Sequence, residues 1–415
     1  MSGAESRGIE DRPAVRLSRL IPALGIAQII SWGTLVYAIA VLSEAMRAEL
    51  NISASWLFGA FTFGLLLSGA ASPVAGRLVD ARGGRLVLSC GSLLGAASLA
   101  TVASAESTVL LFIGWGLVGI AMAACLYDPA FATLHQLTGT AYRRAVTALT
   151  LFGGFASTVF WPASQWLLDA FGWRATLWIY AGLHLIVCLP LHLAFVPGRR
   201  VATASVHEHG HAMQAAATAS SEAARGSSRG AFVWLATALS IAAFLAAALA
   251  AHLIVVLKAA GLTEREAVLV SSLIGPMQVA GRIAEFGFAR RLSPLQVGAL
   301  AFVLMAAGMA ALALINGFSP MAFVFAILYG WSNGVMTIVR GTVPAALFGR
   351  RNYGALLGRL AQPAFVARAF APVAFTLMLA AGLPRGAALW TLFAGAAFAL
   401  VGYRQATRAA GQRRL

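Results

Sequence analysis

Long apolar stretches separated by short polar segments run along the whole chain. A helix needs about 20 mainly apolar residues to cross the hydrocarbon core of a bilayer, whereas a barrel strand alternates over about 10 residues. The stretches here are continuous and do not alternate, so they predict helices whose backbone groups are bonded internally. We expect an all-α membrane protein with twelve transmembrane helices, over residues 20–45, 56–78, 86–104, 109–136, 145–168, 175–196, 231–257, 266–289, 294–315, 321–341, 355–382 and 386–404.

One long polar segment interrupts this pattern near the middle of the chain. It is rich in Ala, Ser, Gly and His and shows no apolar period, which is typical of a disordered linker. It divides the helices into two groups of six. The predicted organisation is an N-terminal tail, a six-helix bundle, a cytoplasmic linker, a second six-helix bundle and a C-terminal tail, over residues 1–19, 20–196, 197–230, 231–404 and 405–415.

The two groups of helices resemble each other. The stretch Tyr127-Asp128-Pro129 corresponds to Val339-Arg340-Gly341, and Pro162 corresponds to Pro372, with offsets of 212 and 210 residues. A duplicated bundle is typical of secondary transporters, which bind substrate between the repeats near the middle of the membrane. The repeat therefore favours a 6+6 pseudo-symmetric transporter.

Composition and charge support a membrane location. Hydrophobic residues make up 60% of the chain and charged residues 11%, against roughly a quarter charged in soluble domains. The net charge of +16 could suggest nucleic acid, but with the N-terminus in the cytoplasm most arginines fall on the cytoplasmic side, as the positive-inside rule requires. We expect no nucleic-acid partner and a multi-pass protein of the inner (plasma) membrane, with both termini cytoplasmic; the opposite side holds Arg47, Arg174, Lys258, Arg265 and Arg385.

A charged, glycine-rich turn joins the second and third apolar stretches. Gly76, Asp80, Gly83 and Arg85 lie in it at fixed spacing. The turn is too polar for lipid and too short for a domain, so it predicts a tight hairpin at the membrane surface. This spacing, the twelve stretches and the central linker resemble the major facilitator superfamily over nearly the whole chain, although Ala81 stands where that family usually has a basic residue.

The resemblance implies a rocker-switch carrier that performs no covalent chemistry on its substrate. It implies that Asp80 and Arg85 lock the second helix against the eleventh when the carrier faces outward, with Gly76 allowing close contact. The alternative is a turn that only sets topology, but glycine spacing and an acidic residue are not needed for topology alone.

Other positions resemble the branch of monocarboxylate and oxalate/formate carriers. Those carriers have an arginine in helix eight and often a second cation in helix ten or eleven, which Arg282 and Arg368 match. The animal monocarboxylate carriers have an aspartate one turn before that arginine, where this chain has Gln278, so their proton-coupling scheme does not carry over. The similar layout elsewhere involves Trp32-Gly33, Tyr37, Gly153-Gly154 and the turn Phe171-Gly172-Trp173-Arg174.

Ionisable residues inside membrane helices are costly and are functional candidates. Arg368 lies near the middle of its stretch, so we expect it to bind an anion, the alternative being a structural partner for a carboxylate or helix dipole. Arg282 has two possible registers. Local similarity to the hairpin places it at the cytoplasmic edge, and repeat spacing places it inside helix eight, where it would bind substrate or act as a gate.

Asp128 is the one carboxylate well inside an apolar stretch, while Glu285 lies nearer an end. Arg340 is the repeat counterpart of Asp128. We predict that these two opposite charges approach each other across the repeats in the outward-facing state, with Glu285 as a further gating residue. Asp128 is also the candidate proton carrier, and its alternative partner lies within its own half.

Weaker signals complete the candidate site. His252 could titrate or only pack, and Tyr37, Gln278, Trp331 and Asn333 could line the cavity and bind substrate. The tract from His207 to His211 resembles a metal site but stands alone in the linker, so no metal or other cofactor is expected.

We expect a secondary active transporter, not an enzyme. Its substrate would be a small organic anion such as a monocarboxylate, moved by rocker-switch alternating access and coupled to protons or a counter-ion. The alternative is a proton-driven multidrug or metabolite efflux pump, a class that usually needs a carboxylate deep in the cavity. The partners expected are the lipid bilayer, the solute and the coupling ion, and the chain is expected to be a monomer.

Overall fold

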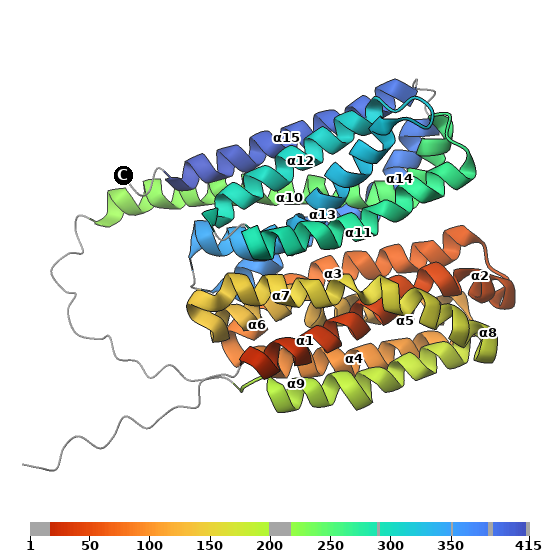
Figure 1. Cartoon of the computed structure of the whole chain (residues 1–415). Coiled ribbons are helices and arrows are strands. Elements are labelled where there is room, and N and C mark those ends of the chain that lie inside the picture. The colour runs from red at the N-terminus through yellow and green to blue at the C-terminus, as the bar shows by residue number, and fades with distance from the viewer. Residues whose placement is uncertain (1–16, 199–216, 289–290, 350–351, 381–384, 412–415) are drawn as a thin grey trace, which may run out of the picture.

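Two helical bundles lie side by side in the computed structural model of the chain (Figure 1). The structure describes residues 17–198, 217–288, 291–349, 352–380 and 385–411, and these contain helices and short turns but no strand. The expected all-α fold is confirmed for these residues. The tract from His207 to His211 lies outside them.

The N-terminal bundle contains six passes, several of them interrupted. The first pass consists of α1, a short π-helix and α2. The fourth pass consists of α5 and α6, and the fifth consists of α7 and the start of α8. The sixth pass consists of the rest of α8, a second π-helix and α9. The elements are α1 (Leu17–Trp32), η1 (Gly33–Tyr37), α2 (Ala38–Leu50), α3 (Ala54–Arg82), α4 (Gly84–Ala103), α5 (Thr108–Cys125), α6 (Tyr127–Thr138), η2 (Gly139–Ala141), α7 (Tyr142–Gly154), α8 (Ala156–Leu183), η3 (His184–Cys188) and α9 (Leu189–Phe195).

The C-terminal bundle consists of six long helices. Its first helix begins at Ala217, inside the segment expected to be an unstructured linker. Residues 217–229 include four alanines, the residue with the highest helix propensity. The elements are α10 (Ala217–Ala259), α11 (Glu264–Phe288), α12 (Pro294–Ala313), α13 (Pro320–Phe348), α14 (Tyr353–Ala380) and α15 (Arg385–Gly411).

Ten helical segments of the described chain are long and apolar enough to cross a membrane. One of them, from Thr108 to Phe195, has 88 residues, which would extend for about 130 Å as a single helix. It is divided where Gly139 and Gly172 adopt positive φ angles of 53° and 78°, so it makes three passes. The described chain is thus consistent with twelve transmembrane passes.

The hairpin between α3 and α4 depends on glycine. Gly83 has a φ of 86°, in the region that residues with a Cβ rarely adopt. A Cβ on the next residue, Gly84, would overlap the side chain of Thr133 in α6. We call the end of the molecule that contains this hairpin and residues 138–142, 348–349 and 352–353 the arginine-rich end; it lies on the left in Figure 1.

Each bundle has its own apolar core, and a third buried cluster joins the two at the arginine-rich end. Ile338, Tyr353 and Leu357 of the second bundle lie in this cluster with residues of α1, α3, α6 and α7. The end of α3 and the start of α14 meet there, and Ala361 and Phe365 extend the contact toward the middle of the membrane. The bundles are therefore closed against each other at this end.

Candidate functional site

Asp128 and Arg340 form an ion pair between the two bundles. One terminal nitrogen of Arg340 donates to both carboxylate oxygens of Asp128, at 3.2 and 3.3 Å. The fourth pass is broken at Leu126, which has extended backbone angles, and Asp128 lies in the first turn of the helix that follows. A carboxylate is stabilised at a helix N-terminus, so the break both orients and stabilises the side chain of Asp128.

Asp80 joins α3 to the start of α14. Its two carboxylate oxygens accept hydrogen bonds from the backbone N–H groups of Gly354 and Ala355, at 2.9 and 2.7 Å. The first N–H groups of a helix have no partner within the helix, and Asp80 supplies one from the other bundle. A Cβ on Gly76 would overlap the carbonyl oxygen of Gly354, so glycine permits this close approach.

The hairpin arginine behaves differently from the aspartate. The side chain of Arg85 is exposed, and within the described part of the chain no ion pair joins it to the second bundle. The contact between α3 and α14 here therefore rests on Asp80 and on glycines. Any locking role of Arg85 remains a prediction from the resemblance.

Glu285 of α11 is buried and bonded to α7 of the first bundle. Its carboxylate pairs with Arg143 at 2.7 Å and accepts a hydrogen bond from the hydroxyl of Thr147, also at 2.7 Å. Arg143 donates in addition to the carbonyl oxygen of Leu292. This second polar bridge lies at the same end of the molecule as the pair of Asp128 and Arg340.

Tyr142 and Tyr353 complete the closed end. The hydroxyl of Tyr142 donates to the carbonyl oxygen of Gly341 at 2.8 Å and lies 3.1 Å from the hydroxyl of Tyr353. Tyr353 also bonds to Gly341 and stacks on the ring of His135 at 4.0 Å. Among the described residues, the polar bonds between the bundles lie at the arginine-rich end.

Arg282 lies inside α11, six residues before the end of that helix at Phe288. It is 6% exposed, and its Nε donates to the carbonyl oxygen of Gly334 at 3.3 Å. A Cβ on Gly154 of α7 would overlap its guanidinium group. The glycine thus lets an arginine of the second bundle reach the surface of the first.

Arg368 is half-buried in α14, with its guanidinium carbon 5.2 Å from the ring centre of Phe365. The charges of Arg368 and Arg282 both act on the hydroxyl of Tyr37. Tyr37 ends the π-helix of the first pass, and such π-bulges are frequent at functional sites. Its ring lies 6.1 Å from that of Trp161. Two arginines of one bundle thus interact electrostatically with a tyrosine of the other.

Gln278 and Asn333 lie on helix faces shared with the charged residues. Gln278 is half-buried one turn before Arg282 on α11, and Asn333 is half-buried two turns before Arg340 on α13. Trp331 is not part of this group. It is nine residues from Arg340, which is about two and a half turns, so it lies on the opposite face and is 37% exposed.

His252 connects two helices of the second bundle. Its Nε2 lies 3.0 Å from the carbonyl oxygen of Pro372 and 3.2 Å from the hydroxyl of Thr376, both in α14. It therefore lies one turn beyond Arg368, away from the arginine-rich end. In these contacts it joins α10 to α14.

Sequence reasoning missed Tyr142, Tyr353 and the pairing role of Arg143. Arg143 was counted only among the charges that set topology. A signal for the tyrosines was present, since they are 211 residues apart, close to the offset of the repeats. For Arg143 no comparable signal exists, because its partner Glu285 is not its repeat counterpart.

Comparison with known proteins agrees with this architecture. The family model of the Major Facilitator Superfamily matches residues 24–318, more than half of the chain. Monocarboxylate transporter 11 of Mus musculus is 38% identical over 129 residues, which are 30% of this chain and 28% of the relative. The human protein of that name is 37% identical over 140 residues, 32% of this chain and 29% of the relative. These matches span less than a third of each relative.

Solved structures show the same fold. The Escherichia coli fucose:proton symporter has a TM-score of 0.67 at 16% identity, covering 93% of this chain and 98% of its own. The human organic anion transporter MFSD10 has a TM-score of 0.67 at 14% identity, covering 94% and 99%. With the family match and the paired bundles described above, these findings show that the chain is a multi-pass transporter that belongs to the Major Facilitator Superfamily.

Proposed function

We propose that the protein is a secondary active transporter of a small organic anion such as a monocarboxylate. The observation that carries this proposal is the placement of a buried Arg282 and a half-buried Arg368 in membrane-spanning helices. A carboxylate between them would accept charge-assisted hydrogen bonds from both guanidinium groups. Tyr37 would donate from the opposite bundle.

The charge balance of the described residues supports an anion. Arg340 has Asp128 as its partner and Arg143 has Glu285. Neither Arg282 nor Arg368 has a carboxylate within ion-pair distance among the residues that the structure describes. A cation held inside a membrane without an anionic partner is costly, and a negative substrate would supply that partner.

The contacts between the bundles support rocker-switch alternating access. We infer that the arginine-rich end is cytoplasmic, that both termini lie there and that the membrane is the inner (plasma) membrane. In that orientation the structure is closed to the cytoplasm by Asp80, by the pair of Asp128 and Arg340 and by Glu285. Opening toward the cytoplasm must break these bonds, so they set the balance between the two states.

The coupling ion and the oligomeric state complete the proposal. Asp128 is the coupling residue that we favour, because it is the acidic partner in the bridge that must open during transport. Its protonation would weaken the bond to Arg340 and link proton movement to the conformational change. A counter-anion exchanged through the same arginines is the other form of coupling, and the working unit is a monomer without a cofactor.

The alternative is a proton-driven multidrug or metabolite efflux pump. That class usually places a carboxylate deep in its cavity to meet a cationic compound. Asp128 and Glu285 are instead bonded to arginines at the arginine-rich end. The partial similarity to the two monocarboxylate transporters also favours an anion.

Transport by purified protein in liposomes tests the proposal. Radiolabelled monocarboxylates and lipophilic cations would be compared with and without a proton gradient, using the natural chain, Arg368→Gln and Arg265→Gln. Arg265 is an exposed arginine at the other end of α11, so it serves as the control. We expect carboxylate uptake that Arg368→Gln abolishes and Arg265→Gln preserves; uptake of cations alone, unchanged by Arg368→Gln, would overturn the proposal.

A further inference from the structure

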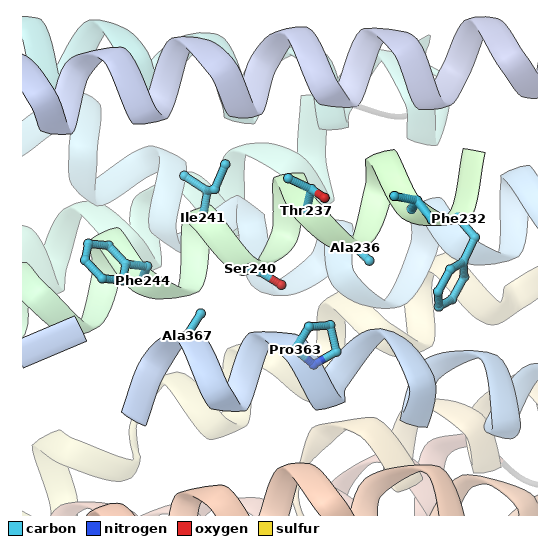
Figure 2. Close-up of a pocket in the computed structure, with 9 residues that line it drawn as sticks. Phe232, Ala236, Thr237, Ser240, Ile241, Phe244, Pro363 and Ala367 are labelled. Carbon is cyan, nitrogen blue, oxygen red and sulfur yellow. The ribbon is translucent and has the colours of Figure 1, made fainter. Parts of the chain in front are cut away.

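A groove with a volume of about 430 Å³ opens on the second bundle between α10 and α14 (Figure 2). This volume lies within the range of about 300–1,000 Å³ found for small-molecule sites. The groove is mainly apolar, with two hydroxyl groups. Its lining consists of Phe232, Val233, Ala236, Thr237, Ser240, Ile241, Phe244, Pro363 and Ala367.

The groove lies on the outer surface of the bundle. Val366 and Phe370, which neighbour the lining residues on α14, are 40% and 52% exposed, and Val233 on α10 is 52% exposed. Arg368 directly follows the lining residue Ala367, which places it about 100° around the helix from that residue. The groove therefore faces lipid, and Arg368 lies on a different side of α14.

A cation lies at one end of this groove. The guanidinium carbon of Arg359 is 5.0 Å from the ring centre of Phe232, and its side chain is exposed. It is six residues from the start of α14, or about 9 Å along the axis, near the depth where headgroups meet hydrocarbon. Within the described part of the chain no carboxylate pairs with it.

The groove also holds a polar group without a partner. The hydroxyl oxygen of Ser240 is buried and makes no hydrogen bond, and its side chain points toward α14 in Figure 2. Thr237 lies one turn nearer to Arg359. An unbonded hydroxyl in an apolar site is unfavourable, and an ester carbonyl of a lipid would accept a hydrogen bond from it.

We propose that this groove binds one anionic phospholipid from the leaflet at the arginine-rich end. The phosphate contacts Arg359, and an acyl chain lies along α10 between Phe232 and Phe244. Basic sites between transmembrane helices are known to hold acidic headgroups. A free phosphate would use only the arginine, whereas a phospholipid matches the cation, the hydroxyl groups and the apolar length together.

Photo-crosslinking of the full chain in lipid nanodiscs tests this assignment. Phosphatidylglycerol or phosphatidylcholine with a diazirine on one acyl chain would be added in trace amounts, and labelled peptides would be identified by mass spectrometry. We expect phosphatidylglycerol to label residues 232–244 and 363–367 more than phosphatidylcholine does. Arg359→Gln should reduce that labelling about fivefold, the effect of one arginine near an anionic lipid.

Two further variants separate this site from general lipid contact. Arg404→Gln removes an exposed arginine of α15 at the same end of the molecule and should leave the labelling unchanged. Ala367→Phe fills the groove and should reduce labelling while Arg359 is retained. Equal labelling by both lipids, labelling insensitive to Arg359→Gln, or uniform labelling of all outer helix faces would overturn the proposal. None of these results depends on which solute is transported.

Discussion

Asp128 and Arg340 occupy equivalent positions in the two halves of the chain and are bonded to each other at 3.2 Å across the interface between the bundles. Their side chains are 15% and 20% exposed, so water screens the pair only in part. A bond between symmetric positions joins the bundles near their common axis. It must therefore open whenever the bundles rock apart at the arginine-rich end.

Exchanging the two charges tests this pair. Asp128→Asn or Arg340→Gln alone leaves one charge without its partner, which is strongly unfavourable in a partly buried site. We expect each to reduce substrate uptake in proteoliposomes by at least about tenfold. The double exchange Asp128→Arg with Arg340→Asp should recover part of the uptake, and no recovery would show that the two residues act separately.

Removing the charge of Asp80 should weaken closure at the arginine-rich end. Asp80→Asn removes one of the two acceptor oxygens that bind the backbone N–H groups at the start of α14, and loss of a helix cap costs about 1 kcal/mol. We expect spin labels at Thr140 and Arg291, exposed in the two bundles, to report a larger population with the end open. Asp169→Asn, which changes an exposed carboxylate of α8, is the control and should leave the distances unchanged.

Adding one methyl group at Gly76 should have a similar effect through packing. The new Cβ would overlap the carbonyl oxygen of Gly354 and force α3 away from α14. Overpacking of this kind costs about 1–3 kcal/mol. Gly76→Ala should therefore lower the thermal stability of the purified protein and shift the label distances, whereas Gly275→Ala, with open space around it, should do neither. An unchanged Gly76→Ala protein would contradict the tight contact.

Substitutions at Arg368 should separate the contribution of its charge to substrate binding from that of its guanidinium geometry. Arg368→Gln removes the cation, and loss of a hydrogen bond to a charged group costs about 1.5–3 kcal/mol, so we expect substrate binding to weaken by about 10- to 100-fold. Arg368→Lys keeps the charge and should retain more affinity. Binding would be measured by titrating solute into purified protein, and equal losses in both variants would argue that arginine geometry, not charge, is required.

Most of the fold could be predicted from the sequence because a helix that crosses lipid must be apolar over a defined length. Apolar length alone predicts where helices cross, and the near-constant offset between Asp128 and Arg340 predicts the repeat. Local breaks were not visible in the same way. The interruption at Leu126 and the π-helix that ends at Tyr37 depend on packing against neighbouring helices, which leaves no periodic signal.

Residue types and their spacing by themselves determined which side chains are functional candidates: charges in apolar stretches, and an aspartate among glycines in a hairpin. Only the tertiary structure decided their partners. It joined Asp80 to the start of α14, Glu285 to Arg143 and Arg359 to an outer groove, and it placed Trp331 on the opposite helix face from Arg340. The physical reason is that hydropathy is a property of each segment, whereas a bond between bundles depends on rotation and depth, which are set by how all the helices pack together.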